Sequence, residues 1–382
     1  MLAMTFFTTP YRYRALAFSL LLGLSACQNL PQLKPWQIDA SVSWQKLDTV
    51  PYKGKQDDIY FIDSEQGWYG NGAGKLYQTK DGGQNWQEIW SQPGTFIRAL
   101  GFIDAQRGLI GNIGTDYFPG VTDEQPLYQT RDGGKSWTKV MYPNGQPVKG
   151  ICAIDILRNN FINSGVMDQR TIIHAAGRVG GPAQLMRSLD GGENWKVLDL
   201  SAHTAMILDV KFFDAMTGFV FGASDADTAK SHARIIMTRD GGQTWHTVYQ
   251  SKRLHELTWK ASFPSREVGY VTIQSYDTNP DNQQRYVAKT EDGGLSWREI
   301  ELVKDHKVRE FGVGFVDNLN GWVGTINGGY QTTDGGKSWR HVAMGRAVNK
   351  IRVIKDRQGV VAYAIGSDVY KFNQPHPLQN QP

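Results

Sequence analysis

Short runs of alternating apolar and polar residues recur along the chain and predict β-strands. A first set of four runs lies at 59–63, 67–71, 75–79 and 85–89. A second set with the same order lies at 312–317, 321–325, 329–333 and 338–342. Alternation with a period of two is typical of strands with one buried face, and four such runs joined by tight turns predict a four-stranded antiparallel sheet.

One motif, Ser/Thr-x-Asp-Gly-Gly-x-x-Trp, occurs six times between the third and fourth runs of such sets. The copies span 79–86, 130–137, 188–195, 238–245, 290–297 and 332–339. Their aspartates are Asp81, Asp132, Asp190, Asp240, Asp292 and Asp334, and their tryptophans are Trp86, Trp137, Trp195, Trp245, Trp297 and Trp339. A repeat of about 50 residues in a β-rich chain predicts the blades of a β-propeller.

We interpret these six motifs as structural turns. The aspartate can accept hydrogen bonds from backbone N–H groups of its own turn, and the Gly-Gly pair permits positive φ angles. The tryptophan can bury a large apolar area between the sheets. Six identical turns in six blades do not build one metal or acid–base site, so we assign no catalytic role to their aspartates.

The last blade is predicted to close with the N-terminal strand. After the sixth motif, residues 348–373 contain three strand-like runs and no fourth. The segment Trp44–Leu47 matches the fourth runs that begin at Trp86, Trp195 and Trp297. Closure by this segment would remove both open sheet edges. We therefore predict an all-β, seven-bladed propeller over residues 41–373.

The N-terminus predicts an exported lipoprotein. Arg12 and Arg14 precede a short apolar stretch, 15–23, and the segment then ends in Leu-Ser-Ala-Cys at Cys27. The stretch is too short to span a bilayer as a helix and is typical of a signal peptide. We expect residues 1–26 to be removed and Cys27 to carry lipid, with 27–40 as a tether and 374–382 as a disordered tail. Gln28 after the cysteine favours the periplasmic face of the outer membrane.

Composition and charge favour a β-rich protein and do not favour a nucleic-acid-binding one. The 42 glycines and 12 tryptophans among 382 residues suit short strands and tight turns better than helices. The formal net charge is only +4, which does not favour a nucleic-acid partner. Because no metal-ligand spacing, cofactor motif or nucleophile motif stands out, we predict no catalytic residue, no cofactor and no metal site. We expect a monomer.

The loops between second and third strands form the candidate partner-binding face. They are long in four consecutive blades, at 111–126, 175–183, 222–233 and 274–284, and short in the others. Long loops grouped on one face indicate use in binding. The candidate residues there or at the starts of first strands are Arg98, Asp116, Tyr117, Phe118, Arg178, Asp225, Asp227, Lys230, Arg234, Tyr276, Asp277, Arg309 and Lys350. Loop charges that merely pair with one another are the other interpretation.

The six motifs resemble the Asp-box, or bacterial neuraminidase repeat. Together with the seven-blade count and the units 61–68 and 315–322, the chain resembles the photosystem II stability and assembly factors and their bacterial relatives. The resemblance implies a non-catalytic scaffold that binds partner proteins, such as a membrane-protein complex during assembly. In a photosynthetic host it would place the protein in the thylakoid lumen.

A carbohydrate-active protein is the alternative function. Asp-boxes are also common in sialidases and in seven-bladed glucanases, so the resemblance leaves a glycoside hydrolase or a carbohydrate-binding propeller open. A glycosidase needs two carboxyl groups placed together in space, and a single sequence cannot pair them.

Overall fold

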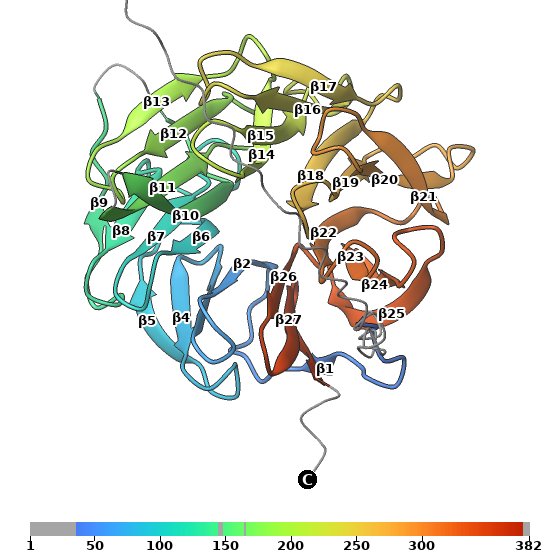
Figure 1. Ribbon diagram of the computed structural model, residues 1–382, viewed down its shortest axis with the longest axis horizontal. Coiled ribbons are helices and arrows are strands. Elements are labelled where there is room, and N and C mark those ends of the chain that lie inside the picture. The colour runs from blue at the N-terminus through green and yellow to red at the C-terminus, as the bar shows by residue number, and fades with distance from the viewer. Residues whose placement is uncertain (1–35, 144–147, 164–165, 377–382) are drawn as a thin grey trace, which may run out of the picture. The chain divides into compact units, whose positions relative to one another are not determined.

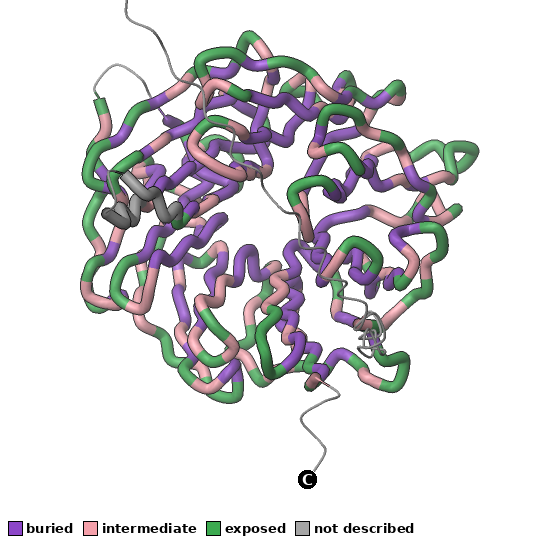
Figure 2. The backbone as a smooth tube through the Cα atoms, viewed as in Figure 1, coloured by how far each residue is buried: buried purple, intermediate pink, exposed green. Residues whose placement is uncertain are grey.

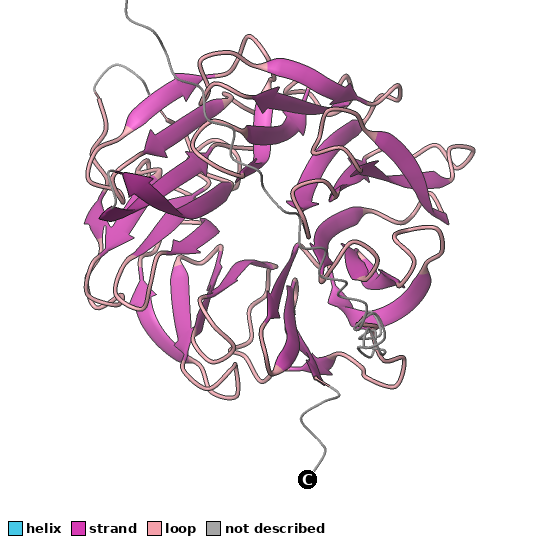
Figure 3. Cartoon of the chain, in the orientation of Figure 1, coloured by secondary structure: helices cyan, strands magenta, loops and turns pink. Residues whose placement is uncertain are grey.

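The apolar runs form strands, and the remaining described residues lie in turns and loops (Figure 3). The computed structural model describes residues 36–143, 148–163 and 166–376. The chain divides into two units, Met1–Gln37 and Ile38–Pro382, and all the strands belong to the second. Cys27, the expected signal peptide and most of the expected tether lie outside the described residues.

Seven four-stranded antiparallel sheets, the blades, make up the second unit (Figure 1). Blade 1 comprises β2 (Gln56–Phe61), β3 (Gly67–Asn71), β4 (Lys75–Thr79) and β5 (Gln87–Ser91). Blade 2 comprises β6 (Ile97–Phe102), β7 (Gly108–Asn112), β8 (Leu127–Thr130) and β9 (Thr138–Lys139). Blade 3 comprises β10 (Ala153–Asn163), β11 (Val166–Ala176), β12 (Gln184–Ser188) and β13 (Lys196–Asp199).

Blades 4 to 6 repeat this arrangement in chain order. Blade 4 comprises β14 (Met206–Phe212), β15 (Gly218–Ala223), β16 (Ala233–Thr238) and β17 (His246–Gln250). Blade 5 comprises β18 (Glu256–Ser262), β19 (Gly269–Ser275), β20 (Gln284–Thr290) and β21 (Arg298–Lys304). Blade 6 comprises β22 (Glu310–Phe315), β23 (Gly321–Thr325), β24 (Asn327–Thr332) and β25 (Arg340–Arg346).

Blade 7 joins the two ends of the propeller. It comprises β26 (Lys350–Lys355), β27 (Gly359–Ile365), β28 (Val369–Pro375) and β1 (Gln45–Lys46). Gln45 pairs with Lys371 and Lys46 with Tyr370, so the prediction that the N-terminal strand completes this sheet is confirmed. The ordered sheet runs on to Pro375, two residues past the expected boundary at 373.

The first strands of successive blades contact one another from β2 through β6, β10, β14, β18 and β22 to β26, and β26 contacts β2. The first strands therefore surround the central axis, where most of their residues are buried (Figure 2). The prediction of an all-β, seven-bladed propeller is confirmed.

A repeated aromatic stack joins neighbouring blades. At five interfaces a phenylalanine at the end of a first strand lies against a ring on the second strand of the preceding blade. The pairs, with their centroid distances, are Phe61 and Tyr363 (3.7 Å), Phe102 and Trp68 (3.6 Å), Phe212 and His174 (3.6 Å), Phe263 and Phe219 (5.4 Å), and Phe315 and Tyr270 (3.6 Å). Each stack buries apolar surface on both blades at once.

The motif tryptophan completes each stack from the same blade as the phenylalanine. Trp86, Trp137, Trp245, Trp297 and Trp339 meet these phenylalanines edge-on, at centroid distances of 6.0–6.5 Å. The glycine that opens the second strand lies beneath the ring. A Cβ atom added at Gly67 or Gly108 would lie 2.4 or 2.3 Å from Phe61 or Phe102, so no larger residue fits without moving the ring.

Blade 7 packs on blade 6 through Trp44. Trp44 is buried and lies edge-on to Trp322 of blade 6, at 5.3 Å between ring centroids. It also packs on Phe372 at 5.7 Å. Trp44 thus resembles the motif tryptophans in directly preceding the fourth strand of its blade, but it meets the second-strand ring of the preceding blade directly.

The six Asp-Gly-Gly turns share one hydrogen-bond pattern. The serine or threonine hydroxyl donates to the aspartate at 2.7–2.8 Å. The aspartate accepts the backbone N–H four residues later at 2.9–3.0 Å. Both glycines have φ angles between 68° and 96°, a region that favours glycine. These contacts support the structural role expected for the motif.

Buried or partly buried carboxylates tie first strands to one another around the axis. Asp58, Asp155 and Asp209 accept the backbone N–H of Leu100, Phe212 and Ala261, each on the next blade, at 2.8–2.9 Å. Such bonds to a charged acceptor are stronger than those between neutral groups. They fix the relative height of neighbouring blades.

Replacing Trp44 tests the closure of the ring. We expect Trp44→Ala to lower the free energy of unfolding by about 3–5 kcal/mol, because it removes a buried ring from the contact with Trp322 and Phe372. Gln45→Ala, one residue away on the exposed side, is the control and should cost less than about 0.5 kcal/mol. Urea unfolding measures both, and equal midpoints for the two variants would contradict the closure.

The Asp-Gly-Gly turns predict a loss of stability in acid. Hydrogen bonds from Asn85 to Asp81 and from Ser136 to Asp132 lower the pKa of both carboxyls to about 2. The ionised forms therefore stabilise the fold fully above about pH 4, and this contribution disappears as the pH falls toward about 2.

The double variant Asp81→Asn, Asp132→Asn should flatten this dependence. Its free energy of unfolding should change less between about pH 5 and pH 2.5 than that of the natural chain, although it is less stable at neutral pH. Glu124→Gln, at an exposed position, is the control. A double variant with the same pH slope as the natural chain would show that the turns do not carry the effect.

Candidate partner-binding site

The long loops gather on the face opposite the Asp-Gly-Gly turns. The loops between second and third strands span 113–126, 177–183, 224–232 and 276–283 in blades 2 to 5. In blades 1, 6 and 7 these connections have one to three residues. The turns lie on the other face, since the first glycine of five of them donates to the loop between the first and second strands of its own blade.

Aromatic residues and one arginine from three blades meet on the long-loop face near the axis. Phe118 stacks on Phe96 at 4.6 Å, and Tyr117 lies edge-on to Phe118 at 4.7 Å. The Arg309 guanidinium lies 4.6 Å from the centre of the Tyr276 ring. We call these five residues, Phe96, Tyr117, Phe118, Tyr276 and Arg309, the axial patch.

The axial patch is exposed above a rigid floor. Tyr117 and Phe118 are 40% and 38% exposed, whereas Phe96 and Tyr276 pack on a buried cluster that includes Leu257. Burial raises the pKa of Tyr117 to about 12, with a further contribution from nearby Tyr276. The two tyrosines come from blades 2 and 5, so the structure brings together residues that are more than 150 positions apart in the chain.

Three predicted binding residues are buried and serve the fold. Arg98 and Lys350, 6% and 7% exposed, form ion pairs with Asp57 and Asp58 at the axis. Burial lowers the pKa of Lys350 to about 7. Both residues lie near the start of a first strand, where their side chains are buried at the axis. They are therefore not available to a partner.

Arg178 is the third of these residues. It is 5% exposed and donates to the backbone carbonyls of Gly181 and Thr115, at 2.9 and 2.5 Å. It therefore holds the loop of blade 2 against that of blade 3. Arg178 positions Tyr117 rather than offering a charge to solvent.

Most other predicted residues order their own loops. Asp225 and Asp277 accept backbone N–H groups two residues later, and Arg234 binds Gln250 and the His203 carbonyl. Asp227 pairs with Lys230, and Asp116 pairs with Lys149, at 3.5 and 3.7 Å between exposed groups. Exposed pairs of this kind contribute little to stability.

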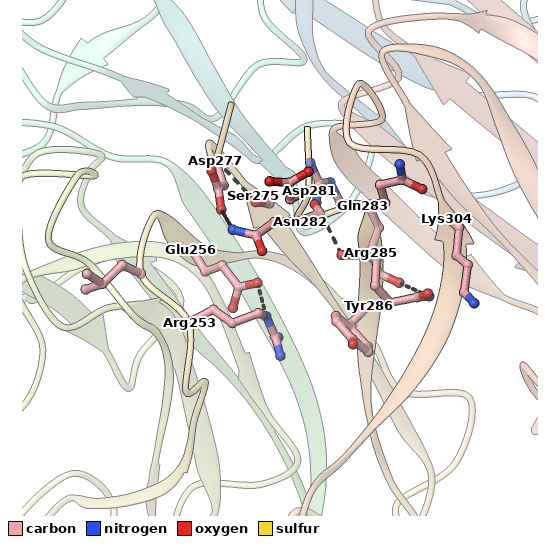
Figure 4. Close-up of a pocket in the computed structure, with 12 residues that line it drawn as sticks. Arg253, Glu256, Ser275, Asp277, Asp281, Asn282, Gln283, Arg285, Tyr286 and Lys304 are labelled. Atoms are coloured by element: carbon pink, nitrogen blue, oxygen red, sulfur yellow. Dashed lines mark hydrogen bonds and ion pairs between the residues drawn. The ribbon is translucent and has the colours of Figure 1, made fainter. Parts of the chain in front are cut away.

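A cavity of about 380 Å³ lies on the same face beside blade 5 (Figure 4). Its lining comes from the connection before β18, the loop 276–283 and the adjoining ends of β18, β19, β20 and β21. We call it the blade 5 pocket; its polar lining includes Arg253, Glu256, Asp277, Asp281, Gln284 and Arg285. Of these, sequence reasoning singled out only Asp277. Arg253 lies in the short connection before β18 and Glu256 is the first residue of that strand, and neither belongs to a repeated motif.

Neither a metal-ligand cluster nor a membrane-spanning helix is found among the described residues. They contain no group of three or more His, Cys, Asp or Glu side chains placed to hold a metal ion. In the part of the chain that the structure covers, no helix is long and apolar enough to cross a membrane.

Solved propellers share this fold. YCF48 from Cyanidioschyzon merolae matches with a TM-score of 0.62 and 15% identity, over 87% of this chain and 99% of that one. A structure described as YCF48 bound to D1 peptide matches with a TM-score of 0.61 and 16% identity, over 87% and 95% of the two chains. The GH74 enzyme of Niastella koreensis matches with a TM-score of 0.56 and 16% identity, over 84% of this chain and 52% of that one.

At these low sequence identities, the structural similarity shows a common fold alone. The expected resemblance to the photosystem II stability and assembly factors is confirmed at the level of the fold. No protein-family model matches the chain, and no curated protein sequence does either.

Proposed function

We propose that this chain is a non-catalytic scaffold that binds a segment of a partner protein on the axial patch. The observation that carries the proposal is the convergence of Tyr117, Phe118 and Tyr276 with Arg309 at one end of the axis. Aromatic residues and arginine supply most of the binding energy in protein interfaces. One similar propeller, YCF48, has been solved with a peptide bound.

The partner in this proposal belongs to a membrane-protein complex during its assembly. A lipid on Cys27 would hold the propeller at the periplasmic face of the outer membrane, or in the thylakoid lumen of a photosynthetic host. The rigid core beneath the patch favours binding without a large change of shape, since the floor residues are buried and contact several blades.

Site-specific photo-crosslinking in cells tests the binding face. A photoreactive phenylalanine analogue at position 117 should crosslink to a membrane protein, because this position is exposed on the axial patch. The same analogue at position 319, 47% exposed in the loop between β22 and β23, is the matched control. Tyr276→Ala should weaken the crosslink from position 117 at least about tenfold if it acts as an interface anchor.

Two results would contradict the scaffold. One is a specific crosslink from position 319 with none from position 117. The other is hydrolysis of a β-glucan or a sialoside by the purified chain, which would favour the carbohydrate-active alternative.

Cell fractionation tests the anchor. Cys27→Ser removes the thiol that lipid transfer requires, so the variant should move from the membrane fraction to the soluble periplasmic fraction. Cys152→Ser, at a buried position, controls for the loss of a cysteine and should stay with the membrane. A membrane-bound Cys27→Ser variant would contradict lipidation at this residue.

A further inference from the structure

The blade 5 pocket contains a buried carboxyl group with an unused oxygen. Glu256 is 3% exposed and lines the pocket. Its Oε1 accepts from Arg253 Nε at 2.6 Å, whereas its buried Oε2 has no hydrogen-bond partner among the residues that the structure describes. A buried acceptor without a partner costs about 1–3 kcal/mol. The pocket therefore lacks a donor at this position.

The arginines that line the pocket are already engaged. Arg253 binds both oxygens of Glu299 at 2.9 Å, and its guanidinium lies 4.2 Å from the centre of the Tyr286 ring. The buried Arg285 donates to the backbone carbonyls of Val308, Asn282 and His306. Neither guanidinium is thus directed at a ligand as an anion receptor.

The groups that remain in the pocket are mostly acceptors. Besides Glu256 Oε2, Gln284 Oε1 is buried and has no partner. Asp281 adds an exposed carboxylate at the rim. Lys304 adds one cation to the lining, at an exposed position on β21. The pocket is thus better suited to a donor-rich, positively charged group than to an anion.

We infer that the blade 5 pocket binds a basic side chain, the ammonium of a lysine or the guanidinium of an arginine, from the partner segment. Glu256 Oε2 and Gln284 Oε1 accept its N–H groups, and Asp281 attracts it at the rim. The inference rests on the proposed function and specifies the chemistry of the partner.

Loop 276–283 places the pocket next to the axial patch. Its first residue, Tyr276, belongs to the axial patch, and Asp277, the next residue, lines the pocket. Leu254, 48% exposed, adds an apolar contact at the pocket rim. An extended segment seated on Tyr276 can therefore place a long side chain in the pocket, and this position favours a residue of the partner as the occupant.

Ligand-observed NMR titration of the purified full chain in detergent tests this inference. The probe is the peptide acetyl-Ala-Lys-Ala-amide, and its counterparts carry norleucine or glutamate in place of lysine. We expect the lysine peptide to bind with a Kd near the millimolar range, and the norleucine and glutamate peptides at least about tenfold more weakly. Equal binding of the norleucine peptide, or tighter binding of the glutamate peptide, would overturn the inference.

Variants place the binding in the pocket. Glu256→Gln should weaken binding of the lysine peptide at least about tenfold, whereas Glu301→Gln, an exposed carboxyl on β21 outside the pocket, should leave it unchanged. Lys304→Ala removes a like charge and should leave affinity equal or higher. If Glu256→Gln fails to fold, as judged by near-ultraviolet circular dichroism, Gln284→Leu replaces it and should weaken binding about threefold or more.

The outcomes separate this inference from the proposed function. Normal binding by a folded Glu256→Gln or Gln284→Leu variant, or weaker binding by Lys304→Ala, would overturn the pocket assignment alone. Putrescine binding as tightly as the lysine peptide would assign the pocket to a free amine instead of a partner residue. Loss of crosslinking at position 117, with lysine binding intact, would instead contradict the scaffold.

Discussion

The contact on which the ring depends is the stack of a first-strand phenylalanine against an aromatic ring of the preceding blade. A sheet packed face to face on another sheet needs complementary side chains on both surfaces. Here a ring such as Phe102 meets Trp68 of blade 1 by its face and Trp137 of its own blade by its edge. The glycine beneath it, Gly108, leaves the space that the ring fills. Recurrence of this unit gives most interfaces the same spacing.

Closure extends the same contact to the chain ends. The C-terminal blade has no Asp-Gly-Gly turn, but Trp44 supplies an aromatic contact with Trp322 of the preceding blade. The backbone pairing of β1 covers only two residues, so the buried tryptophan contributes more to closure than the ladder itself. Carboxylates at the axis align the first strands. Arg98 and Lys350 form ion pairs with carboxylates there.

Because the axial charges are engaged in ion pairs, the residues available for binding are those on the long loops. Charges at the start of first strands are withdrawn from solvent, so Arg98 and Lys350 stabilise the floor on which exposed groups stand. The long loops carry Tyr117, Phe118 and Tyr276 above that floor, and rigid support of this kind limits the entropy lost when a partner binds. In the blade 5 pocket, by contrast, no described residue donates a hydrogen bond to the buried Oε2 of Glu256.

The sequence by itself determined the elements and their repetition. The period of about 50 residues, the alternating runs and the match of Trp44 to the motif tryptophans are local patterns, and they sufficed to predict seven blades and the closure. It also located the long loops and the aromatic residues on them, because loop length and residue type are read directly along the chain.

Tertiary structure alone decided which of these residues meet and which are exposed. Tyr117 and Tyr276 come together because blades 2 and 5 converge at the axis. The local sequence pattern does not indicate which loops converge there. Arg178 looks like a free loop charge until its three-dimensional neighbours, the carbonyls of Thr115 and Gly181, are known. Burial and charge pairing depend on groups distant in the chain, so a single sequence could not separate the arginines that hold the site from the residues that form it.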